Sequence, residues 1–158
     1  MKLIFSFLTA FILFFQSGLE SLRESYSKAN SSNANTEEFI NIAEKTSGSD
    51  AVIQGYKAAA KIMEAKITQN NRKALVKSGA TSLEAIIKSN PNNAELRVIR
   101  MSVQENIPKI VGYNKNLKED KTFILNNYSK QNSALKTYIR KFAMQSKTMT
   151  AAEKNSLK

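Results

Sequence analysis

Apolar residues recur at spacings of three and four along most of this chain, and this spacing limits its fold more than any other feature. Val52, Tyr56, Ala59 and Met63, for example, share one face of a helix. No segment alternates apolar and polar residues in the manner of a half-buried strand. Only five Gly and two Pro interrupt the 158 residues. The pattern therefore predicts an all-α fold.

Breaks in the pattern predict about six to seven helices. Thr36, Asp50 and Ala94 are expected to begin helices, and Thr150 with Glu153 forms the sequence of a capping box. The expected helices cover about 19–26, 36–46, 51–67, 94–106 and 117–128, with a further one between Asn71 and Ser89 and a last one that includes Leu135 and Ala143. The helix at 94–106 is apolar on more than one side, which is typical of a central helix. Short turns predict antiparallel neighbours, so the architecture expected is a stack of helix hairpins.

The N-terminus has the layout of a secretory signal. Lys2 precedes a largely apolar run over residues 3–15, and Gln16-Ser17-Gly18 follows it. The run is short for a membrane-spanning helix, which needs about 20 residues. We therefore expect a signal peptide over 1–18 and an exported protein, periplasmic or secreted, with no stable transmembrane segment after signal removal. An uncleaved anchor is the alternative.

The mature chain is expected to have three parts. Residues 19–35 form a short helix and a polar linker, 36–147 a single helical domain, and 148–158 a frayed C-terminal tail. The 158 residues include no Cys and no His, so thiol and imidazole chemistry and disulfides are excluded. Acidic pairs at 37–38 and 119–120 lie in first turns of expected helices, where carboxylates favour the helix dipole. The sequence therefore predicts no enzyme, no cofactor and no metal site.

Residues 50–106 resemble the tetratricopeptide class of helix-pair repeats. A long helix is followed by a second with Gly79 and, four residues on, Leu83; Pro91 then precedes a third helix. The Gly and Tyr of the first helix, Gly55 and Tyr56, are adjacent instead of three apart. The chain is also similar to short exported helical proteins of bacteria without an assigned activity. The resemblance implies a binding scaffold, built as a tetratricopeptide-like α-solenoid or an irregular helical bundle.

Two regions offer candidate binding residues. Arg97, Arg100 and Gln104 share a helix face, where they either pair with Glu95, Glu105, Glu119 or Asp120 or clamp an anion or a peptide carboxylate. In the loop from Ile107 to Asn116, Tyr113, Asn114 and Lys115 are the candidates for a binding rim. The alternative is that the apolar loop residues fill the core.

The positive charge lies mainly in the C-terminal part. Residues 97–158 hold thirteen Lys or Arg and four Asp or Glu, whereas 20–96 hold ten and nine. Lys136, Arg140, Lys141 and Lys147 are expected to form a basic face on one helix, either solvated or bound to anionic lipid or polysaccharide. Nucleic acid is disfavoured for an exported chain without a recognition motif.

The leading hypothesis is an exported scaffold that binds a protein or peptide in the cell envelope. The alternative is a peripheral envelope protein whose basic C-terminal half binds anionic lipid or polysaccharide.

Overall fold

The computed structural model describes residues 18–157, and every regular element among them is a helix. Residues 1–17 of the predicted signal peptide lie outside the described residues. Its last residue, Gly18, is the first described residue of a helix that covers 18–28. The other elements are α2 (Asn33–Lys45), α3 (Ala51–Ile67), α4 (Arg72–Ser89), α5 (Ala94–Asn106), η1 (Lys109–Val111), α6 (Leu117–Asn127), η2 (Tyr128–Lys130), α7 (Ser133–Gln145) and α8 (Ala151–Asn155). None of the described helices is both long and apolar enough to cross a bilayer.

The all-α prediction is confirmed, and local capping explains several boundaries. The Asp50 carboxylate accepts the backbone N–H of Val52 at 2.8 Å, which fixes the start of α3. At α8, the Glu153 carboxylate accepts from the Thr150 N–H at 2.7 Å and the Thr150 hydroxyl accepts from the Glu153 N–H. These are the reciprocal bonds of a capping box, as the sequence predicted.

The start of α2 was predicted wrongly. The helix begins at Asn33, because the Ser32 hydroxyl accepts the Asn35 N–H at 3.1 Å. Thr36, expected to begin the helix, is fully buried inside its first turns, where its hydroxyl donates to the Ala29 carbonyl at 2.7 Å. The expected polar linker is therefore a short hydrogen-bonded turn, and residues 18–28 form a hairpin with α2.

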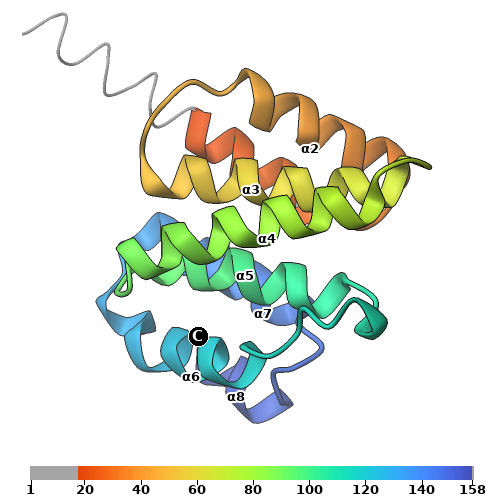
Figure 1. Ribbon diagram of the computed structural model, residues 1–158. Coiled ribbons are helices and arrows are strands. Elements are labelled where there is room, and N and C mark those ends of the chain that lie inside the picture. The colour runs from red at the N-terminus through yellow and green to blue at the C-terminus, as the bar shows by residue number, and fades with distance from the viewer. Residues whose placement is uncertain (1–17, 158) are drawn as a thin grey trace, which may run out of the picture.

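The helices stack in successive pairs, with α5 in the interior (Figure 1). α3 packs against α2, α4 and α5, and α5 in turn packs against α6 and α7. Ten of the thirteen residues of α5 are buried, which confirms the predicted central position. Since α5 contacts helices from both halves of the chain, its polar side chains meet partners from both.

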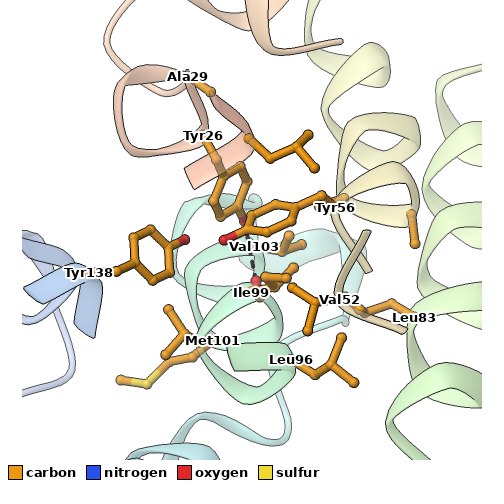
Figure 2. Close-up of a cluster of buried hydrophobic side chains, with 14 of the residues drawn as sticks. Tyr26, Ala29, Val52, Tyr56, Leu83, Leu96, Ile99, Met101, Val103 and Tyr138 are labelled. Atoms are coloured by element: carbon orange, nitrogen blue, oxygen red, sulfur yellow. Dashed lines mark hydrogen bonds between the residues drawn. The ribbon is translucent and has the colours of Figure 1, made fainter. Parts of the chain in front are cut away.

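Aromatic side chains join the N-terminal hairpin to the core. Tyr26 lies 4.9 Å from Phe39 and 5.4 Å from Tyr56, measured between ring centroids, so the first helix, α2 and α3 meet there. Figure 2 shows the hydroxyl ends of Tyr26, Tyr56 and Tyr138 turned toward one another beside α5. Tilted and edge-on ring contacts of this kind add to the free energy that burial of the rings contributes.

The C-terminal residues 148–157, expected to be a frayed tail, include the helix α8 and two buried side chains. Met149 and Leu157 are buried, with 5% and 2% of their surfaces exposed. The Glu105 carboxylate on α5 accepts from the Ser146 hydroxyl at 2.6 Å and from the Thr148 N–H at 2.9 Å. These two bonds hold the connection between α7 and α8 against the end of α5.

Candidate functional site

An arginine network, formed by Arg97, Arg100, Glu84, Glu119 and Asp120, joins α4, α5 and α6. The guanidinium of Arg100 binds both oxygens of Asp120, at 2.7 and 2.6 Å, and the Glu84 carboxylate at 2.6 Å. Arg97 binds Glu119 at 2.6 Å and Asp120 at 3.1 Å. Asp120 is fully buried, and only 3% of the Arg100 side chain is exposed. Carboxylates of the same chain therefore bind both guanidinium groups, while the buried Nε of Arg97 has no hydrogen-bond partner among the described residues.

The network also shifts the pKa values of its members. Burial raises the pKa of Asp120, against the opposing effect of Arg100. Burial disfavours the charge on Arg100, but bonds to Asp120 and Glu84 raise its pKa above the ordinary value. A hydrogen bond from Asn116 lowers the pKa of Glu119. The same Asn116 exchanges two hydrogen bonds with Gln104, at 3.2 and 3.0 Å. These contacts support the structural account of the arginines, with Glu119 and Asp120 as partners.

Of the three predicted loop residues, only Tyr113 contacts the arginine network. The Tyr113 hydroxyl donates to Glu84 at 2.7 Å, and burial, helped by this carboxylate, raises the pKa of Tyr113. Asn114 is half-buried and Lys115 exposed, and neither joins the network. The expectation that the apolar loop residues fill the core is wrong for Ile110, which is 96% exposed.

Two of the four cations in the predicted basic face contact other side chains. The other two, which we call the open cations, are exposed. Lys136 lies over the Tyr128 ring at 5.9 Å, and Lys147 donates to the Asn106 side chain at 2.8 Å. Arg140 and Lys141 are exposed and form no ion pair with the residues that the structure describes. They lie four and three residues before Met144, which is 70% exposed, so all three share the outer surface of α7.

A second, partly buried ion pair was not foreseen. Arg23 donates from two guanidinium nitrogens to the two oxygens of Glu95, at 2.8 and 2.6 Å. Glu95 also accepts the Tyr56 hydroxyl at 2.8 Å. From the sequence, Glu95 was one of the expected partners for the arginines of α5. The structure turns it to the opposite side, toward the first helix and α3.

The described part of the chain contains a cleft of about 400 Å³, which we call the α5–α7 cleft. Its walls come from the end of the first helix, from α5 and from α7. The lining residues are Tyr26, Ser27, Lys28, Asn30, Ser31, Ser102, Glu105, Asn106, Tyr138, Phe142 and Gln145. Aromatic rings thus lie beside amides and hydroxyls, a combination found in ligand sites. The volume lies in the range of small ligand pockets, roughly 300–1,000 Å³.

The cleft is lined by two phenols, Tyr26 and Tyr138, and by one carboxylate, Glu105. Burial raises the pKa values of Tyr26 and Tyr138, so both phenols stay protonated at neutral pH. The Glu105 carboxylate already accepts bonds from Ser146 and Thr148. Among residues 18–157, no group of acidic side chains is arranged to hold a metal ion. The cleft offers aromatic surface, amides and hydroxyls to a ligand.

No sequence pattern predicted this cleft. Several of its residues, Asn30 and Ser31 among them, lay in the stretch taken as a polar linker, and no local pattern brings residue 26 near residue 138. A run of small polar residues directly after a helix with an apolar face is the one signal that could have drawn attention to this wall.

No protein-family model matches the chain, and no curated protein or solved structure is significantly similar to it. The tetratricopeptide-like pattern of residues 50–106 stays a prediction.

Proposed function

We propose that this protein is an exported, non-enzymatic helical scaffold that binds a segment of a protein or peptide partner in the cell envelope. The observation that carries the proposal is the α5–α7 cleft, which joins an aromatic surface to a rim of amides and hydroxyls. Tyr138 and Phe142 offer apolar contact area to a side chain of the partner. Asn30, Asn106 and Gln145 offer donors and acceptors that match backbone amides.

The cleft is nearly balanced in charge, which defines the partner further. Lys28 and Glu105 are its charged lining residues. Lys28 already binds Glu24 at 2.7 Å, so its charge is partly compensated. The segment bound should therefore be neutral and partly apolar, and salt should weaken its binding little, since charge pairing contributes little.

The scaffold is proposed to be tetratricopeptide-like over α3, α4 and α5. The close contact between α3 and α4 at Gly79 supports this proposal. An added Cβ there would lie 2.6 Å from the Ala58 carbonyl oxygen. Only a glycine permits this approach, and Leu83, one turn later, is fully buried. Export into the envelope rests on the layout of residues 1–18.

Peptide display tests the proposal without knowledge of the natural partner. A library of random peptides is selected on the protein without residues 1–17, and the enriched peptides are titrated against two variants. Gln145→Trp places a large ring in the cleft, whereas Ser133→Trp places it on the exposed N-terminus of the same helix. We expect Gln145→Trp alone to weaken binding, by about tenfold or more, which is the effect of losing about 1.4 kcal/mol. Equal binding to both variants, or no enriched peptide, would contradict the proposal.

Binding of anionic lipid or polysaccharide by the basic face is a second candidate function. It is favoured by one observation, the exposed Met144 beside the open cations Arg140 and Lys141. Replacement of both cations by Glu should then abolish binding to phosphatidylglycerol vesicles at low salt. Unchanged vesicle binding by this variant would rule the candidate out.

A further inference from the structure

The turn between α5 and α6 presents apolar side chains to solvent. Ile110 is 96% exposed and Val111 43% exposed, and both belong to the short 3-10 helix η1. We call residues 109–112 the loop tip. Isolated exposed apolar residues are common, but two adjacent ones at the end of a projecting turn form a small continuous patch.

Hydrogen bonds hold the loop tip in its projecting position. The Val111 N–H donates to the Pro108 carbonyl and the Gly112 N–H to the Lys109 carbonyl, both at 3.0 Å. Gly112 adopts a φ of 73°, and an added Cβ would meet no atom within 4 Å there. Behind the tip, Tyr113 is anchored to Glu84 at 2.7 Å. The tip is therefore a formed turn that faces open solvent.

The charges around the apolar pair are mostly positive. Lys109 precedes it, and Lys115 and Lys118 follow, all of them exposed. The acidic neighbour in the first turn of α6, Glu119, is already paired with Arg97 at 2.6 Å. The surroundings therefore combine an apolar tip with cations whose long side chains can reach an anionic surface.

We propose that the loop tip docks on an anionic phospholipid bilayer, with Ile110 and Val111 inserted at the boundary between headgroups and acyl chains. Short apolar segments with flanking lysines bind such interfaces through buried apolar area and attraction to anionic headgroups. A folded protein partner fits less well, because a stable interface needs about 800 Å² on each side, far more than these two side chains provide. This proposal is independent of the α5–α7 cleft, and it is an alternative to the second candidate function, which places the lipid contact on α7.

A tryptophan reporter tests the insertion directly. The chain has no Trp, so Ile110→Trp introduces the single one. The matched control is Asn92→Trp, on the exposed turn at the opposite end of α5. With vesicles of phosphatidylglycerol and phosphatidylcholine in equal parts, we expect a blue shift of the emission for Ile110→Trp and none for Asn92→Trp. With phosphatidylcholine alone, neither variant should shift. An unshifted Ile110→Trp spectrum with the anionic vesicles would overturn the proposal.

Vesicle sedimentation separates the loop tip from the other surfaces. The double variant Ile110→Ser with Val111→Ser should bind the anionic vesicles at least about tenfold more weakly, because the apolar area that enters the bilayer is lost. The control variant Asn92→Ser, on the exposed turn before α5, should bind as the wild type does. The proposal fails if the double variant binds normally, or if Met144→Ser alone abolishes binding. Analytical ultracentrifugation tests whether the loop tip instead binds a second copy of the chain. If the wild type is a dimer and the double variant is a monomer, the tip is a dimer contact and the proposal fails.

Discussion

The guanidinium group of Arg100 binds both carboxylate oxygens of Asp120, at 2.7 and 2.6 Å, in the interior of the protein. This pair joins α5 to α6, and the bond from Arg100 to Glu84 adds α4. A planar guanidinium matches a carboxylate in this two-point geometry, whereas a lysine cannot. The charge cluster that the sequence offered as a possible clamp thus ties three helices together.

Asp120→Asn should strongly destabilise the protein. The substitution removes the negative charge that faces two arginines, and Arg100 stays buried with one partner fewer. Breaking a buried ion pair in this way costs about 3–5 kcal/mol of the free energy of unfolding. Urea denaturation measures the loss. Glu119→Gln is the matched control, because its side chain is 58% exposed and should cost less than about 1 kcal/mol. Equal effects of the two variants would contradict the structure.

Gly79→Ala should destabilise the contact between α3 and α4. A Cβ at this position would lie 2.6 Å from the carbonyl oxygen of Ala58 and from a side-chain carbon of Ile62. The two helices would have to separate, at a cost of about 1–3 kcal/mol that exceeds the helix propensity of alanine. Thermal unfolding followed by circular dichroism gives the change, and Ser78→Ala on the exposed side of α4 serves as the control. A more stable Gly79→Ala variant would show that the helices are not in contact there.

Alkaline pH should unfold the protein. Burial raises the pKa values of Tyr26, Tyr56, Tyr113 and Tyr138 above the ordinary value of 10.0. The folded state therefore keeps these protons at a pH at which the unfolded state has lost them. Stability should be complete below about pH 10 and decline above it. Urea denaturation at a series of pH values checks this decline, which Tyr138→Phe should make shallower. If the free energy of unfolding is constant from pH 8 to about pH 12, the buried phenols do not control stability at alkaline pH.

Glu105→Ala should release the C-terminal segment without unfolding the rest. Its carboxylate accepts from the Ser146 hydroxyl and from the Thr148 N–H, the two bonds that hold the connection to α8. Hydrogen exchange followed by mass spectrometry should show faster exchange over 146–157 and little change in α3. Lys147→Ala is the control, since it removes only an exposed contact with α5. Uniform acceleration in both regions would mean that Glu105 stabilises the whole fold.

Thr36→Val should weaken the N-terminal hairpin. The buried hydroxyl donates to the Ala29 carbonyl at 2.7 Å, and valine of the same shape leaves that acceptor without its donor. A lost bond of this kind costs about 1–3 kcal/mol, which chemical denaturation detects. Thr137→Val, at an exposed position of α7, should change stability by less than about 0.5 kcal/mol. If Thr36→Val is as stable as the wild type, the turn does not depend on this bond.

Helix positions were largely predictable because their signals are local. Asp50 begins α3 through a bond to an N–H two residues away, and the capping box of α8 spans only four residues. The start of α2 was missed because Thr36 and Ser32 are both acceptable capping residues. Only the fold shows that the Thr36 hydroxyl is buried against Ala29.

The sequence by itself determined an all-α chain, the order of its helices, the central position of α5 and the excess of positive charge over residues 97–158. The tertiary structure decided which charges meet. Glu95 turns to Arg23, more than seventy residues away in the chain, whereas Asp120 receives both arginines of α5. It also decided that the α5–α7 cleft forms and that Ile110 faces solvent. Periodicity reports which face of a helix is buried, but the partner of a buried charge depends on how helices distant in sequence pack.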